Sequence, residues 1–159
     1  MLDRRDIEIV LSEQKTEISR KAKSVLCRRK EESLINLNST MAQIVIGVRR
    51  SGKSTLCFQA LHHAGVSFAY VNFDDERLVD TTTEDLNVIL EVLYKIYGDF
   101  THLFLDEIQN VQGWHLFVNR LLRQGIKILV TGSNAKLLSS ELATHLTGRH
   151  TTIELYPFS

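Results

Sequence analysis

Cysteine is scarce in this chain of 159 residues, and its two copies argue against several classes of small protein. Cys27 and Cys57 lie far apart and form no C-x-x-C pair, so neither a disulfide scaffold nor a zinc site is indicated. The six histidines show no metal-ligand spacing with cysteines or acidic residues, which favours roles on helix faces or at the surface. We therefore expect buried or idle thiols.

Long apolar runs are also missing. No stretch of eighteen apolar residues occurs, and the first segment, MLDRRDIEIVLSEQ, is too charged to contain the apolar core of a signal peptide or a membrane span. The sequence therefore predicts a cytoplasmic protein without a membrane partner.

The chain has no net charge, because nineteen basic residues balance nineteen acidic ones. This balance argues against the overall positive field that non-specific binding to nucleic acids uses. The segment from Lys15 to Lys30 is a local exception, with seven basic residues, one glutamate, and apolar residues at helical spacing. A solvated helix face is the favoured interpretation of this segment, and a contact with a phosphate backbone is the alternative.

Five short apolar runs of strand length alternate with segments of helical periodicity. A charged, helical segment precedes them and ends at about Leu37. Strands that are apolar almost throughout are buried on both faces, which favours a parallel sheet with helices on each side. The sequence thus predicts an α/β fold with about five parallel strands, after a helical N-terminal extension over residues 1–40. The predicted strands are QIVIGV, SFAYVNF, THLFLD, IKILVTG and TTIELY.

The segment GVRRSGKST, residues 47–55, stands between the first predicted strand and a helix-like run. It matches the pattern G-x-x-x-x-G-K-[ST], in which backbone N–H groups surround phosphates and the lysine reaches the β- and γ-phosphates. Lys53 is expected to neutralise the phosphates and Ser54 to ligate Mg²⁺, whereas an ordinary glycine-rich turn is the alternative. The candidate nucleotide-binding residues are Gly47, Arg50, Ser51, Gly52, Lys53, Ser54 and Thr55.

Polar side chains follow two later strands, at the edge of the sheet where folds of this kind bind ligands. The run HLFLDE delivers Asp106 as a second Mg²⁺ contact and Glu107 as a group that can polarise the attacking water. A capping or solvated carboxylate is the alternative for Glu107. In LVTGSNAK, Thr131, Ser133 and Asn134 can hydrogen-bond the γ-phosphate or the water, but Ser133 or Asn134 can equally cap the next helix.

These segments together resemble a known family. The stretches GVRRSGKST, NFDDERL, HLFLDEIQNVQGW, ILVTGSNAKLLSSELATHLTGR and IELYPFS are similar to the N-terminal ATPase domain of prokaryotic AAA-type P-loop ATPases. In that family a C-terminal domain of unknown function normally follows. The resemblance implies a three-layer P-loop NTPase domain over residues 41–159, truncated at its C-terminus because family members continue past PFS.

The resemblance also gives each candidate residue a role in nucleotide hydrolysis. Arg149, in LTGRH, becomes the arginine-finger or sensor candidate, and a finger acts on the γ-phosphate of a neighbouring subunit. A homo-oligomer is therefore one expectation. The remaining implied roles are Lys53 and Ser54 in Walker A, Asp106 and Glu107 in Walker B, and Ser133 or Asn134 in the sensor strand.

The expected activity is Mg²⁺-dependent hydrolysis of ATP to ADP and phosphate, weak in this chain because a closing element is expected beyond Ser159. A nucleotide-dependent switch module with little turnover is one alternative, and a small-molecule kinase is another. The kinase is disfavoured because Glu107 and the polar sensor strand suit activation of water. ATP is the nucleotide that the resemblance implies; the missing guanine-reading NKxD segment gives little basis for choosing ATP over GTP. The sequence identifies no protein or nucleic-acid partner.

Overall fold

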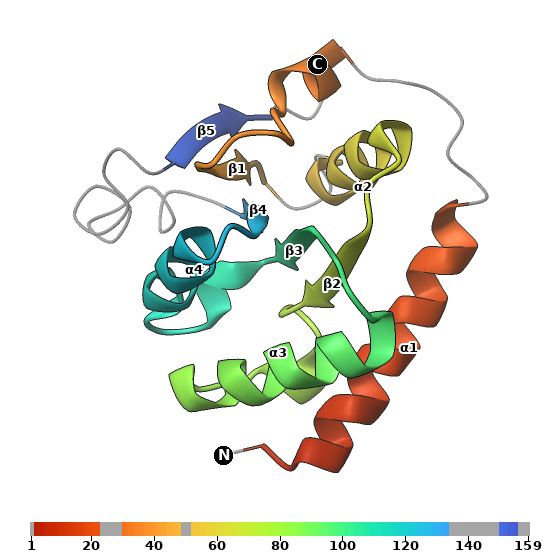
Figure 1. Cartoon of the computed structure of the whole chain (residues 1–159), viewed down its shortest axis with the longest axis vertical. Coiled ribbons are helices and arrows are strands. Elements are labelled where there is room, and N and C mark those ends of the chain that lie inside the picture. The colour runs from red at the N-terminus through yellow and green to blue at the C-terminus, as the bar shows by residue number, and fades with distance from the viewer. Residues whose placement is uncertain (1, 23–29, 49–51, 134–149, 156–159) are drawn as a thin grey trace.

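The predicted strands form one parallel sheet in the computed structural model, which describes residues 2–22, 30–48, 52–133 and 150–155 (Figure 1). The strand order is β2-β3-β4-β1-β5, and each neighbouring pair is parallel. The α/β prediction is therefore confirmed. The strands are β1 (Ala42–Ile46), β2 (Phe68–Asn72), β3 (His102–Asp106), β4 (Lys127–Gly132) and β5 (His150–Glu154).

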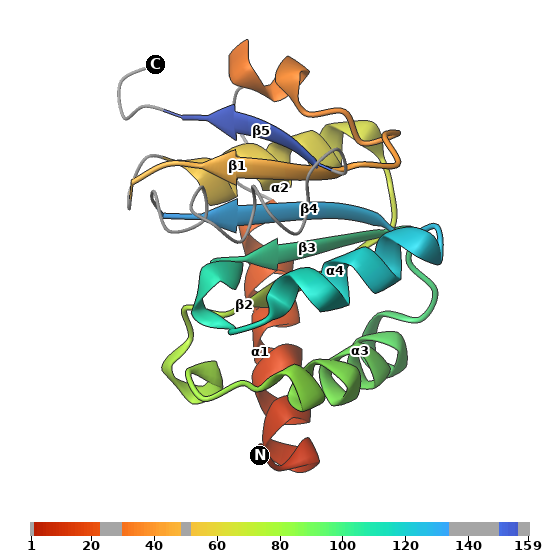
Figure 2. The ribbon, with the colours of Figure 1, turned by 90° about the vertical axis from the view of Figure 1, so that its left-hand side faces the viewer.

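Helices cover both faces of the sheet, which makes three layers. Figure 2 shows α2 behind the sheet and α4 in front of it, while α1 crosses α3 beside the edge strand β2. None of the helices in the described part of the chain is long and apolar enough to cross a membrane. The α-helices are α1 (Arg4–Ala22), α2 (Lys53–Ala64), α3 (Thr83–Tyr97) and α4 (Trp114–Arg123), and short 3-10 helices are η1 (Lys30–Leu34), η2 (Glu76–Leu78) and η3 (Ile108–Asn110).

Alternation along the strands divides the core into two apolar layers. On β3, Leu103 and Leu105 pack in the apolar cluster that includes α1, α3 and α4, whereas Phe104 packs in the cluster with α2 and Ile35, the residue after η1. Because side chains two residues apart share a face, Asp106 lies on the same face as Phe104 and points toward the α2 side. The next acidic residue would point the opposite way if the strand continued.

The N-terminal helix α1 is part of the main core. Ile7, Val10 and Leu11 are buried in the same apolar cluster as the α3 and α4 faces. Gln14, also buried, binds the exposed edge of β2 with its side-chain amide: Nε2 donates to the Asn72 carbonyl at 3.1 Å, and Oε1 accepts from the Asn72 N–H at 3.0 Å. Gln14 thus substitutes for a neighbouring strand and covers an edge that would otherwise remain unpaired.

We predict that Gln14→Ala lowers the free energy of unfolding by about 2 kcal/mol, because it leaves both backbone groups of Asn72 without these partners. Urea denaturation measures the change. Ser12→Ala, an exposed substitution on the same helix, is the matched control and should stay within about 0.5 kcal/mol of the wild type. Equal stability of Gln14→Ala and Ser12→Ala would contradict the role of the amide.

Candidate functional site

The phosphate-binding motif occupies the connection between β1 and α2, at the carboxyl edge of the sheet. The Gly47 N–H donates to the Gly132 carbonyl at 3.2 Å and so ties the start of the loop to the end of β4. Gly52 has a φ of 87°, a left-handed conformation that glycine adopts without a steric penalty, immediately before α2 begins. Arg50 and Ser51 lie outside the described residues.

Lys53 forms a buried ion pair with Glu107. Its Nζ lies 2.8 Å from Glu107 Oε1, and the two side chains are only 7% and 9% exposed. The same carboxylate accepts hydrogen bonds from Ser133 Oγ at 2.8 Å and from Gln109 Nε2 at 2.7 Å. The Glu107 side chain is therefore buried and not solvated, and although Glu107 is the N-cap residue of η3, its side chain makes no capping hydrogen bond.

These contacts determine the charge of Glu107. Burial raises the pKa of the carboxyl, but the hydrogen bonds from Lys53, Ser133 and Gln109 outweigh burial and lower it below its ordinary value. Glu107 is consequently ionised at neutral pH. An ionised carboxylate can accept a proton, which is the property that a general base requires.

The backbone at Glu107 explains why both acidic side chains reach α2. Glu107 has a φ of 58°, the sole positive value among the described residues other than glycine, and its N–H donates to Thr131 Oγ1 at 2.9 Å. This left-handed residue ends β3 and breaks its alternation, so that Glu107 contacts Lys53 while Asp106 contacts Ser54. The turn thus brings two consecutive carboxylates to one helix N-terminus.

Asp106 is held by hydroxyl groups from three elements. Ser54 Oγ lies 3.0 Å from Oδ1 and 2.9 Å from Oδ2, the Tyr70 hydroxyl donates to Oδ2 at 2.7 Å, and Thr131 donates to Oδ1. Burial raises the pKa of Asp106 above its ordinary value, and these hydrogen bonds offset that effect only in part. The buried carboxylate therefore has too little compensating positive charge around it.

The donor set around Asp106 fits Mg²⁺. Mg²⁺ prefers oxygen ligands and is usually held by one or two protein groups together with water and substrate phosphates. When Ser54 donates its proton to Asp106, its oxygen lone pairs remain free for a cation. In the described part of the chain, no group of three or more His, Cys, Asp or Glu side chains could hold a metal ion alone. Phosphate and water oxygens would have to complete the coordination.

The structure assembles part of the site expected from the sequence. The side chains of Lys53 and Ser133 meet Glu107 directly, and Ser54 meets Asp106. The two other candidates, Asn134 and Arg149, lie outside the described residues. Thr131 was expected at the rim of the sheet, but it is fully buried. Its hydroxyl donates to the Asp106 carboxylate and accepts from the Glu107 N–H.

Sequence reasoning missed Tyr70 and Gln109. Tyr70 stands in an apolar strand, where an aromatic residue is typical of core packing. Gln109 lies in η3 and within the stretch HLFLDEIQNVQGW, but the resemblance gave it no role of its own. The hydroxyl of Tyr70 in an apolar strand was the one available signal. It could have been connected to Asp106 only if the pairing of β2 with β3 had been known. In the structure Tyr70 of β2 is paired with Phe104 of β3, which is two residues before Asp106. Tyr70 and Asp106 therefore lie on the same face of the sheet.

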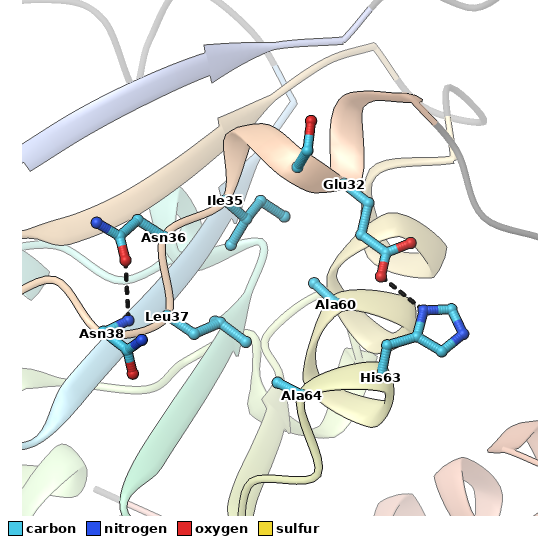
Figure 3. Close-up of a pocket in the computed structure, with 9 residues that line it drawn as sticks. Glu32, Ile35, Asn36, Leu37, Asn38, Ala60, His63 and Ala64 are labelled. Atoms are coloured by element: carbon cyan, nitrogen blue, oxygen red, sulfur yellow. Dashed lines mark hydrogen bonds and ion pairs between the residues drawn. The ribbon is translucent and has the colours of Figure 1, made fainter.

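A hollow of about 400 Å³ lies at the C-terminal end of α2. Figure 3 shows Glu32 and His63 at one side of it, with Glu32 Oε1 2.6 Å from His63 Nδ1. His63 is about 15 Å along the helix from Lys53. This hollow is therefore separate from the phosphate-binding motif. It is lined by Glu32, Ser33, Ile35, Asn36, Leu37, Asn38, Ala60, His63 and Ala64.

Comparison with known proteins gives a family match over most of the chain. The family described as "AAA domain" matches residues 39–159. An uncharacterised protein of Methanocaldococcus jannaschii is 38% identical over 162 residues, which cover 100% of this chain and 35% of that protein. An uncharacterised protein of Haemophilus influenzae is 36% identical over 137 residues, covering 80% and 34%. The chain thus spans about a third of the length of these relatives.

A solved structure shares the fold at low sequence identity. The structure of AMPPCP-bound DnaA from Aquifex aeolicus aligns with a TM-score of 0.53 and 22% identity, over 79% of this chain and 43% of that one. The alignment supports the P-loop NTPase arrangement of the sheet and its helices.

We predict that Asp106→Asn raises stability in the absence of Mg²⁺ and nucleotide. Because the folded-state pKa of Asp106 lies above its ordinary 3.8, wild-type stability is lost as pH rises from about 3.8 through that raised pKa. The neutral asparagine avoids this loss. At pH 7 the variant should therefore have the larger free energy of unfolding.

Urea denaturation at pH 7 and at successively lower pH measures this difference. It should shrink toward pH 3.8, because wild-type Asp106 then also becomes neutral. The exposed Asp80→Asn is the control and should change stability by less than about 0.5 kcal/mol. If Asp106→Asn were less stable than the wild type at pH 7, the interpretation of Asp106 as an insufficiently compensated buried charge would be contradicted.

Proposed function

The chain belongs to the AAA-domain family of P-loop ATPases, and from this premise we propose that it binds ATP with Mg²⁺ and hydrolyses it to ADP and phosphate. One observation carries the proposal: the buried pair of Lys53 and Glu107 lies beside the bonded pair of Ser54 and Asp106. A phosphate-binding cation, oxygen groups for Mg²⁺ and an ionised carboxylate are therefore adjacent at one edge of the sheet.

Binding of the triphosphate rests on Lys53 and on the N-terminus of α2. The free N–H groups at the start of a helix attract anions, and the lysine adds a full positive charge. Lys53 already has an anionic partner in Glu107, so the γ-phosphate has to replace that carboxylate beside Nζ. The AMPPCP bound by DnaA, which shares the fold, supports a nucleotide as the ligand here.

Mg²⁺ would be held by Ser54 directly and by Asp106, directly or through water. The ion supplies positive charge that neutralises the phosphate oxygens during phosphoryl transfer. Ser54 and Asp106 keep the hydrogen bond between them in this arrangement, because the serine proton remains on the carboxylate side.

Hydrolysis rests on Glu107. Once Lys53 moves to the phosphate, Ser133 and Gln109 still hold the carboxylate in place, and an oxygen is released to accept a proton from water. Ser133 thereby connects the end of β4 to the water-activating group, which is the role proposed for a sensor residue. Arg149 remains a proposal as a finger that acts across a subunit boundary, and Asn134 as a second sensor candidate.

The domain bounds and the location of the protein in the cell are also proposals. We assign residues 41–159 to the ATPase domain, with residues 1–40 as its helical N-terminal extension, in a protein that works in the cytoplasm. Because the chain spans about a third of its relatives' length, further parts of a full-length protein would determine its macromolecular partner.

We predict that Glu107→Gln abolishes most ATP turnover, by about a hundredfold or more, because the amide cannot accept the proton. The same variant should bind Mg–ATP at least as tightly as the wild type, since the anion that competes for Lys53 has become neutral. Phosphate release measures turnover and isothermal titration measures affinity. Unchanged turnover would remove the catalytic role of Glu107.

A matched variant tests Lys53 without leaving a buried charge unpaired. Lys53→Ala alone would strand Glu107 in the core, which costs several kcal/mol. In Lys53→Met/Glu107→Gln both charges are gone, so a folded protein is expected with affinity for Mg–ATP at least about tenfold below that of Glu107→Gln. Equal affinities of these two variants would contradict phosphate binding by Lys53.

A further inference from the structure

Packing accounts for the aromatic ring of Tyr70 at its position in β2, but it does not account for the hydroxyl group. The ring lies between Phe58 of α2 and Phe104 of β3, with centroid distances of 4.8 and 5.0 Å, and only 6% of the residue is exposed. A phenylalanine would fill this space equally well. A buried hydroxyl needs a hydrogen-bond partner, because an unpaired one destabilises the fold.

The partner of this hydroxyl is the carboxylate of Asp106. Tyr70 donates to Oδ2 at 2.7 Å, which is a typical distance for a hydroxyl bonded to a charged oxygen. Burial, and then the neighbouring Asp106 charge, raise the pKa of Tyr70 far above its usual range, so the hydroxyl keeps its proton and remains a donor. From the other side, Thr131 of β4 donates to Oδ1. Strands on both sides of β3 therefore each hold one carboxylate oxygen.

We infer that Tyr70 is a positioning residue for the Mg²⁺ site, in which its hydroxyl fixes the rotation of the Asp106 carboxylate. Rotation about the last side-chain bond of an aspartate is soft, so its orientation depends on its hydrogen bonds. With Tyr70 on Oδ2 and Thr131 on Oδ1, the carboxylate presents both oxygens to Ser54. This inference rests on the proposed function, because it concerns the metal that accompanies the nucleotide.

The test uses Tyr70→Phe, which removes the hydroxyl and keeps the ring between Phe58 and Phe104. Tyr97→Phe is the control, because it removes a hydroxyl from a different, half-buried tyrosine on α3. Isothermal titration with AMPPCP is performed in Mg²⁺ and again in EDTA. For each protein the ratio of the two affinities gives the gain due to Mg²⁺, without any contribution from turnover.

For Tyr70→Phe we expect the affinity in EDTA to match the wild type within about twofold, and the gain due to Mg²⁺ to fall about three- to tenfold. Tyr97→Phe should keep both values. An unchanged gain in Tyr70→Phe would overturn the inference. So would an equal loss in Mg²⁺ and in EDTA, because the hydroxyl would then support the fold of the site and not the metal.

The wild-type protein separates this inference from the proposed function. A wild-type gain due to Mg²⁺ that persists in Tyr70→Phe refutes only the role of the tyrosine. Absence of nucleotide binding, or of any gain due to Mg²⁺, in the wild type would refute the proposed function, and the positioning role with it.

Discussion

The buried ion pair between Lys53 and Glu107 is the contact on which the rest of the site depends. Each of these charges would be strongly destabilising alone, because both side chains are more than nine-tenths buried. Ser133 and Gln109 satisfy the remaining capacity of the carboxylate, and Thr131 holds the backbone of Glu107 in its left-handed conformation. The carboxylate of Glu107 thus stands where a phosphate would be expected to interact with Lys53.

The order of the strands determines which groups can meet. Because β4 lies between β1 and β3, its end lies beside both the start of the phosphate-binding loop and the turn that carries Glu107. Thr131 and Ser133 therefore bond to the residues that follow β3, while the Gly132 carbonyl accepts from Gly47 in the loop. Parallel pairing places all three strand ends at one edge, so three segments distant in sequence form one polar site above an apolar core.

The fold and the two main motifs of the site could be predicted from the sequence. The glycine-lysine motif and the acidic end of an apolar strand each have a local pattern, and both the parallel sheet and its helices follow from the alternation of apolar runs. Tyr70 and Gln14 have no such pattern, because their polar contacts depend on which residue lies opposite them after folding. The left-handed conformation of Glu107 could not be predicted either, because the sequence HLFLDE is equally compatible with a regular strand end.

The central claim is that a phosphate replaces Glu107 as the partner of Lys53. The most direct measurement is an experimental structure of this chain with Mg²⁺ and AMPPCP, in which the separation of Lys53 Nζ from Glu107 Oε1 is compared with the 2.8 Å described here. The account predicts that Nζ moves to the β- and γ-phosphates, while Glu107 stays hydrogen-bonded to Ser133 and Gln109. A bound nucleotide with the Lys53–Glu107 pair intact would contradict it.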